Sequence, residues 1–140
     1  MPTADAPASV LDASALLALL KNEPGAPAVI EAIEAGAAIS TVNFSEVLAK
    51  LTERGERVHA TRAAIRKVIE GADGGLHVEP FTEEDATEAA HLRPRSTKQG
   101  LSFGDRACLA LANRLEVSAI TTDRAWADLP EEIVDVRLIR

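Results

Sequence analysis

The segment LSFGDRACLALANRL, residues 101–115, decides the fold class of this chain. Ser102 and Asp105 have the spacing of a capping box, and the apolar residues after them recur at helical spacing, so the segment predicts a helix. The next residues, 117–121, have the composition of a strand, and Asp123 follows them. In an α/β protein, an acid that opens a helix and an acid that follows a strand can meet at the sheet edge where ligands usually bind.

The rest of the chain repeats this alternation of helices and short strands. Clusters of Gly, Pro and polar residues separate the segments, and residues 93–100 have the composition of an exposed loop. The pattern predicts an α/β protein with a central, mainly parallel sheet of four to five strands between two helical layers, built as one domain over residues 1–140. We expect strands at 8–11, 38–42, 76–79, 117–121 and 134–139, and helices at 13–21, 28–35, 43–54, 58–71 (with a buried stripe of Ile65, Val68 and Ile69), 82–92, 101–115 and 125–129.

The composition limits the class of protein. Aromatic residues make up only 3% of the chain and hydrophobic residues 46%, so Ala, Leu, Val and Ile must build the core. The single cysteine, Cys108, excludes an internal disulfide, fits a reducing compartment and is expected in the core. No segment is apolar and long enough to span a bilayer, and residues 1–10 lack the features of a signal peptide. We therefore expect a cytoplasmic protein.

The charge distribution leaves two interpretations open. The net charge of −7 argues against non-specific binding to nucleic acid, which depends on Lys and Arg neutralising phosphates. Several basic residues nevertheless lie near the acids along the chain, so they form either a local basic rim around an acidic centre or an ordinary solvated surface. The candidates for nucleic-acid contacts are Arg93, Arg95, Lys98, Arg106 and Arg124.

Four acids occupy equivalent places in the predicted architecture. Asp12 and Asp123 each follow a strand, and Glu46 and Asp105 each lie in the first turn of a predicted helix. Taken singly, each is explained by helix capping. If the strands are parallel, however, the acids that follow them face one sheet edge, and Asp105 joins them if the loop before it returns to that edge.

A cluster of four carboxylates needs compensation. Two carboxylates about 5 Å apart repel by roughly 3 kcal/mol at an effective dielectric near 20, whereas a helix N-terminus offsets only about 0.3–1 kcal/mol. The cluster therefore predicts either a bound cation or protonated members. Oxygen ligands favour a hard divalent ion, Mg²⁺ or Mn²⁺.

Three polar side chains could support these acids. Ser14 lies beside Asp12, and Thr121 lies beside Asp123, so both hydroxyls could bond a carboxylate or a water. A Ser at a helix start and a Thr in a strand also have purely structural explanations. Asn43 is expected to be the N-cap of its helix, with a possible second role in orienting Glu46.

Other kinds of catalytic site find no support. The three histidines and the single cysteine lack zinc-ligand spacing. The chain contains no GxxxxGK[ST] phosphate-binding loop and no GxSxG nucleophile elbow.

At four places the sequence resembles the PIN-domain ribonucleases, and most closely the VapC toxins of bacterial toxin–antitoxin pairs. The resemblance covers almost the whole chain, and the order of the four motifs at this length is specific. The motifs are VLDASA at 10–15, STVN at 40–43 leading to Glu46, LSFGDRA at 101–107, and TTDRAW at 121–126.

The resemblance implies a PIN fold and Mg²⁺- or Mn²⁺-dependent endoribonuclease activity on a structured RNA such as tRNA or rRNA. It also implies a homodimer and a cognate antitoxin. The acidic quartet of the family corresponds to Asp12, Glu46, Asp105 and Asp123 as catalytic and metal-binding residues, and its hydroxyl to Thr121. Asp128 is a candidate fifth acid, although a surface acid in a short helix explains it as well.

Alternatives to an RNA-cleaving toxin remain. One is a catalytically silent PIN-like module that binds RNA or a partner, and another is a metal-dependent nuclease acting on DNA. The helices at 13–21 and 28–35 are expected to provide an apolar dimer surface, although core packing would give the same pattern. The residues concerned are Leu16, Leu19, Leu20, Val29 and Ile33.

Overall fold

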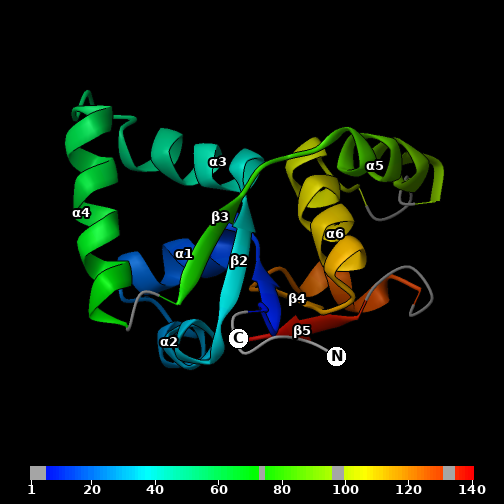
Figure 1. The fold of residues 1–140 in the computed structure, drawn as a ribbon, viewed down its shortest axis with the longest axis horizontal. Coiled ribbons are helices and arrows are strands. Elements are labelled where there is room, and N and C mark those ends of the chain that lie inside the picture. The colour runs from blue at the N-terminus through cyan, green and yellow to red at the C-terminus, as the bar shows by residue number, and fades with distance from the viewer. Residues whose placement is uncertain (1–5, 73–74, 96–99, 131–134) are drawn as a thin grey trace.

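The computed structural model describes residues 6–72, 75–95, 100–130 and 135–140 (Figure 1). The strands of these residues form one all-parallel sheet in the order β3-β2-β1-β4-β5. Because the strands are parallel, their carboxyl ends all lie at one edge of the sheet. The strands are β1 (Ser9–Leu11), β2 (Ala37–Ser40), β3 (Leu76–Glu79), β4 (Ser118–Thr121) and β5 (Val136–Leu138).

Helices cover both faces of the sheet, which confirms the three-layer α/β/α prediction (Figure 1). Successive strand residues point to opposite faces, so Leu11 and Ile120 pack against α1–α4, whereas Val10 and Ala119 pack against α5, α6 and η2. The helices are α1 (Ala13–Leu20), α2 (Ala26–Ala35), α3 (Thr41–Leu51), α4 (Val58–Gly71), α5 (Glu83–Arg95), α6 (Phe103–Leu115) and the 3₁₀ helix η2 (Arg124–Asp128). In the described part of the chain, no helix has the length and apolarity needed to cross a membrane.

The start of α3 differs from the predicted one. Ser40 is the N-cap, and its Oγ accepts a hydrogen bond from the Val42 N–H at 3.1 Å. Asn43, predicted as the cap, is instead a buried residue inside the helix, and Glu46 lies beyond the first turn. The earlier cap is used because β2 ends at Ser40, which is the last residue paired with β3.

Two other predicted helix boundaries were also wrong. Helix α2 begins at Ala26, since Pro27 is tolerated in a first helical turn, where its missing N–H costs nothing. Helix α5 continues to Arg95, so Arg93 belongs to a helix and not to a loop. Lys98 lies outside the described residues.

The predicted dimer surface is mostly core. Leu16, Val29 and Ile33 are fully buried against the sheet, and Leu19 and Leu20 are partly buried against the same core. Conversely, Val68, which was predicted to be buried, is 43% exposed. The dimer surface was mispredicted because α1 and α2 are buried on two sides. Helices that pack beneath other helices are apolar over more than one face.

Candidate active site

The starts of α1, α3, α6 and η2 meet at the carboxyl edge of the sheet. Asp12 is the N-cap of α1 directly after β1, and Asp123 is the N-cap of η2 shortly after β4, the neighbour of β1. Asp105 lies in the first turn of α6, and Glu46 lies on α3, which packs against α6. Residues that are far apart in the sequence therefore approach one another at this edge.

Asp12 is fixed from both sides of its carboxylate. Oδ1 accepts hydrogen bonds from Ser14 Oγ at 2.7 Å and from the Ala15 N–H at 2.8 Å, and Oδ2 accepts one from Thr121 Oγ1 at 2.5 Å. Thr121 Oγ1 in turn accepts the Asp123 N–H at 3.0 Å. These hydroxyls connect the ends of β1 and β4 and leave the Asp12 side chain little freedom to rotate.

Burial raises the pKa of Asp12 to about 6 from its ordinary value of 3.8. The hydrogen bonds from Thr121, Ser14 and Ala15 lower this pKa, but desolvation outweighs them, and the charge of Asp105 raises it further. The Asp12 carboxylate is therefore costly to ionise in the protein alone.

Asp105 forms the predicted capping box. The Ser102 N–H donates to Asp105 Oδ2 at 3.0 Å, and the Asp105 N–H donates to Ser102 Oγ at 3.1 Å. The pKa of Asp105 is raised above its ordinary value, first by burial and then by Asp123, against the opposing effects of the Ser102 hydrogen bonds and of Arg106. Asp105 therefore interacts electrostatically with the acids that follow both strands, since its charge also raises the pKa of Asp12.

Glu46 is held against the first turn of α6. Asn43 Nδ2 donates both to Glu46 Oε1 at 2.8 Å and to the Gly104 carbonyl at 2.9 Å. A Cβ on Gly104 would lie 2.3 Å from Glu46 Oε1, so only glycine allows this approach. Asn43 Oδ1 is buried and accepts no hydrogen bond from the described residues, which leaves one unsatisfied acceptor beside the acids.

Cys108 lies behind this cluster. It is fully buried, and its pKa is raised well above the ordinary value by burial, with further contributions from Asp12, Asp105 and Glu46. The charges of three acids from three separate segments therefore all act on this thiol. The thiol remains protonated, which confirms Cys108 as a core residue and excludes it as a nucleophile.

The donor set suits a hard cation, although the side chains do not form a finished metal site. Within residues 6–72, 75–95, 100–130 and 135–140, no group of three or more His, Cys, Asp or Glu side chains is arranged to hold an ion. The hydrogen bonds explain this, because Asp105 is bonded to Ser102 and Asp123 Oδ1 to the Ala125 N–H at 3.0 Å. Oxygen-only donors, raised carboxyl pKa values and the unsatisfied Asn43 acceptor nevertheless fit Mg²⁺ or Mn²⁺, which keep several of their waters.

The predicted basic residues differ in their surroundings. Arg106 Nη1 donates to the Ala89 carbonyl at 2.9 Å, and its guanidinium lies 5.7 Å from the centre of the Phe103 ring. Arg124 is exposed at the start of η2. Arg93 is exposed on α5, and the side chain of Arg95 lies outside the described part. Asp128, the candidate fifth acid, is exposed at the end of η2.

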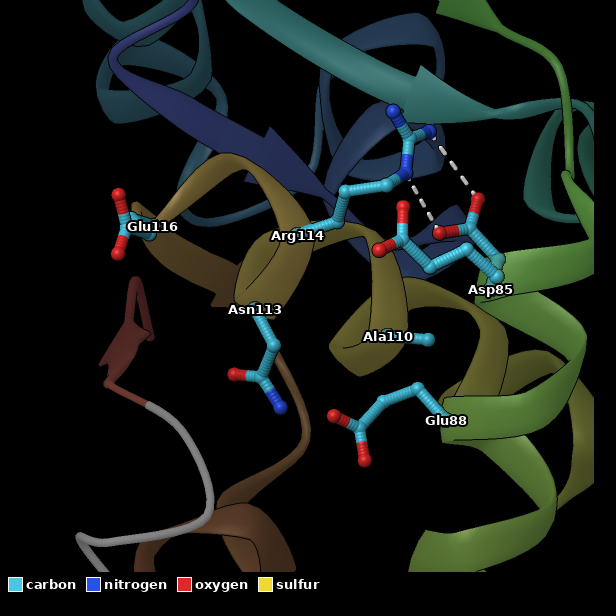
Figure 2. A pocket seen from close by; sticks show the side chains of 7 residues that line it. Asp85, Glu88, Ala110, Asn113, Arg114 and Glu116 are labelled. Atoms are coloured by element: carbon cyan, nitrogen blue, oxygen red, sulfur yellow. Dashed lines mark hydrogen bonds and ion pairs between the residues drawn. The ribbon is translucent and has the colours of Figure 1, made fainter.

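A separate cavity of about 360 Å³ lies between α5 and α6 (Figure 2). Figure 2 shows Arg114 reaching across it to Asp85, with Nε 2.7 Å from Oδ1 and Nη2 3.1 Å from Oδ2. None of the four clustered acids lines this cavity. It is lined by Glu84, Asp85, Glu88, Ala110, Asn113, Arg114 and Glu116.

Two features of this sheet edge could not be predicted from the sequence. The contact between Gly104 and Glu46 joins residues on different helices, so local spacing does not reveal it. Phe81 and Phe103 form an edge-to-face pair with ring centres 5.5 Å apart. Their only sequence hint is their rarity, since the chain has three phenylalanines, one tryptophan and no tyrosine.

The structure is thus an α/β protein with a parallel sheet and four acids at the carboxyl edge of that sheet. The family model of the PIN domain matches residues 9–132, and the chain belongs to this family. No curated protein sequence matches the chain.

Solved structures share the fold at low sequence identity. VapBC2 of Rickettsia felis, bound to a DNA fragment of its promoter, is 14% identical with a TM-score of 0.71, over 94% of this chain and 98% of that one. FitAcB of Neisseria gonorrhoeae is 18% identical with a TM-score of 0.67, over 91% and 95%. VapC20 of Mycobacterium tuberculosis, a toxin that cleaves the sarcin–ricin loop, is 20% identical with a TM-score of 0.64, over 88% and 97%.

Proposed function

We propose that this protein is a divalent-metal-dependent endoribonuclease, the toxin of a VapBC-type toxin–antitoxin pair. The observation that carries the proposal is the gathering of Asp12, Glu46, Asp105 and Asp123 at one sheet edge, where burial raises the pKa of Asp12 to about 6. A buried carboxylate such as that of Asp12 is costly to ionise, and strongly perturbed carboxylates are often found at functional sites. Membership of the PIN family and the likeness to a toxin that cleaves the sarcin–ricin loop support RNA, either tRNA or rRNA, as the substrate.

The four acids would hold Mg²⁺ or Mn²⁺. When bound, the ion lowers the pKa of a coordinated water and neutralises charge on the phosphate. Ser14 and Thr121 keep the Asp12 carboxylate in a fixed orientation, and Asp105 and Asp123, whose carboxylates accept cap hydrogen bonds in the structure, would supply further oxygen donors to the ion.

Glu46 orients the attacking water. Asn43 occupies Glu46 Oε1, so Oε2 is the oxygen that accepts a proton of that water. Attack by water on phosphorus leaves a 5′-phosphate and a 3′-hydroxyl. A ribonuclease that used the 2′-hydroxyl would leave a 2′,3′-cyclic phosphate instead, so the product ends distinguish the two mechanisms.

The partners follow from the same comparison. Because the similar structures include VapBC and FitAB assemblies, we propose a cognate antitoxin that covers the acidic edge, and a homodimer of the toxin. Arg93, Arg95, Lys98, Arg106 and Arg124 are the proposed RNA contacts. The protein would act in the cytoplasm as a single PIN domain.

One observation favours a second function. The cap-bonded acids do not form a finished metal site in the described residues. A catalytically silent PIN module that binds RNA or a partner would need no such site, and Asp12, Asp105 and Asp123 would serve only to cap their helices.

The test is cleavage of total RNA by the purified, antitoxin-free chain in Mg²⁺, Mn²⁺ or EDTA. The proposal predicts a few discrete cuts that require metal and carry 5′-phosphates. Cuts that persist in EDTA with cyclic phosphate ends would contradict the mechanism. RNA binding without cutting in any of the three buffers would favour the silent module.

A further inference from the structure

An exposed aromatic ring lies beside the acidic edge. Of the four aromatic side chains in the protein, Trp126 and Phe44 are buried and belong to the core. Phe103 is 51% exposed, the most exposed large hydrophobic residue among those described. Phe103 therefore presents a half-exposed aromatic ring at the first turn of α6, the helix that carries Asp105.

The ring of Phe81, a residue that follows β3, supports the ring of Phe103. The Phe81 ring meets it edge to face, with an interplanar angle of 74°. The Phe81 N–H donates to Thr41 Oγ1 at 3.0 Å, and Thr41 is the first residue of α3. The pair therefore bridges the starts of α3 and α6, the two helices that carry Glu46 and Asp105.

The ring shares the first turn of α6 with Asp105 and lies beside a cation. Phe103 precedes Asp105 by two residues, a rise of about 3 Å along the helix, so the two side chains leave α6 in different directions, and the intervening Gly104 contacts Glu46. The guanidinium of Arg106 lies 5.7 Å from the ring centre, and its Nε is buried without a partner among the described residues. A planar apolar surface next to a positive charge suits a nucleobase and its phosphate.

We propose that Phe103, supported by Phe81, is a stacking platform for an unpaired nucleobase that flanks the scissile phosphate, with Arg106 beside that phosphate. The identity of the ligand as RNA rests on the proposed function. A base inside a helix presents only its edges, so the platform selects single-stranded loops or bulges in a structured RNA.

A protein partner is the less favoured occupant of this surface. Docking of an apolar peptide needs a continuous apolar patch, whereas Ser102 and Gly104 flank Phe103. The other exposed large hydrophobic residues of the described chain lie on other elements. They are Ile30 on α2, Val58 and Val68 on α4, and Leu138 on β5.

The test uses tryptophan fluorescence in the full chain. Phe103→Trp adds one exposed indole to the buried Trp126, and Val58→Trp, at a half-exposed position on α4, is the matched control. Each variant is titrated with a single-stranded RNA octamer of adenylate and with an RNA duplex of the same length, in Mg²⁺ and again in EDTA. Wild-type spectra are subtracted to remove the signal of Trp126.

We expect saturable quenching of Phe103→Trp by the single strand, little quenching by the duplex, and none of Val58→Trp. Absence of quenching at position 103 in both buffers, or equal quenching by the duplex or at position 58, would overturn the platform. Quenching only by an apolar peptide that blocks RNA binding would assign the surface to a protein partner and overturn the proposal as well.

A cleavage assay separates this proposal from the proposed function. If wild-type protein cuts RNA, Phe103→Leu should raise KM roughly five- to hundredfold with little change in kcat, and Phe103→Trp should restore it. An unchanged KM in Phe103→Leu would overturn the platform and leave the nuclease intact. Quenching at position 103 in a protein that cuts no RNA would support the stacking platform and contradict the proposed nuclease activity.

Discussion

Two helices of this protein begin with the same capping box, Thr82 with Asp85 at α5 and Ser102 with Asp105 at α6. Asp85 is only 2% exposed, and Arg114 neutralises it with two hydrogen bonds (Figure 2). The pKa of Asp105 is instead raised, first by burial and then by the charge of Asp123. The local motif is the same, so the partner supplied by the tertiary fold separates the structural acid Asp85 from Asp105, the proposed catalytic acid.

The largest expected difference between the two acids is catalytic. Asp105→Asn should lower RNA cleavage by about 10²–10³-fold, because it removes a charge where the phosphate reacts. The side-chain oxygen of Asn can still accept the hydrogen bond from the Ser102 N–H, so circular dichroism and the melting temperature should remain close to those of wild type. Asp85→Asn, the matched control, should retain its activity per folded molecule. Equal losses in both variants would mean that neither acid has a special role in catalysis.

The second prediction concerns pH and Asp12. A folded-state pKa of about 6 against 3.8 means that the folded protein binds the extra proton, so this contribution to stability is complete below about pH 3.8 and is lost as the pH rises through about 6. The loss amounts to at most about 3 kcal/mol. In EDTA, Asp12→Asn should therefore become more stable than wild type as the pH rises from 4.5 to 8, as measured by urea unfolding. Parallel stability curves would refute the raised pKa.

The third prediction concerns Asp85, the acid that pairs with Arg114. Asp85→Asn should lower the free energy of unfolding by about 2 kcal/mol, because it leaves the Arg114 guanidinium without its charged partner. Glu84→Gln, at an exposed residue of the same cavity, should change stability little. If both substitutions cost the same in urea unfolding, the ion pair does not stabilise the contact between α5 and α6.

The smallest effect is expected at Gly104. Gly104→Ala would force the Glu46 carboxylate away from α6, since the added Cβ would lie 2.3 Å from Oε1. We expect about a tenfold loss of cleavage with little change in melting temperature. Gly71→Ala, at a helical glycine with open space around it, should leave cleavage unchanged. An active Gly104→Ala variant would show that Glu46 does not need its position against α6.

The sequence predicted the fold class well because burial patterns and caps are local. The alternation of strands and helices, the parallel sheet and the capping box of Ser102 and Asp105 were confirmed. Asn43 shows where local reasoning failed, because Ser40 and Asn43 are both good caps, and the register of β2 with β3 selected Ser40. The buried side of α1 and α2 was also not predictable, because it depends on which helices cover them.

The catalytic roles proposed for the acids depend on contacts between residues far apart in the sequence, which local sequence patterns do not reveal. Gly104 accommodates Glu46, and Thr121 holds Asp12, across long stretches of sequence. Order along the chain suggested that the acids would meet, but spacing alone could not distinguish Asp105 from Asp85. The assignment of the four acids as metal ligands, and of residues 1–140 as a single domain, remains a prediction.

The most direct test of the central claim is a calorimetric measurement of Mn²⁺ binding to the purified chain without RNA. We predict that wild type and Asp85→Asn bind one or two Mn²⁺ ions with the same affinity. Asp105→Asn should bind them at least about tenfold more weakly, since one carboxylate oxygen donor is lost. Absence of Mn²⁺ binding by the wild type, or equal binding by all three proteins, would contradict the claim that the acidic edge is a metal site.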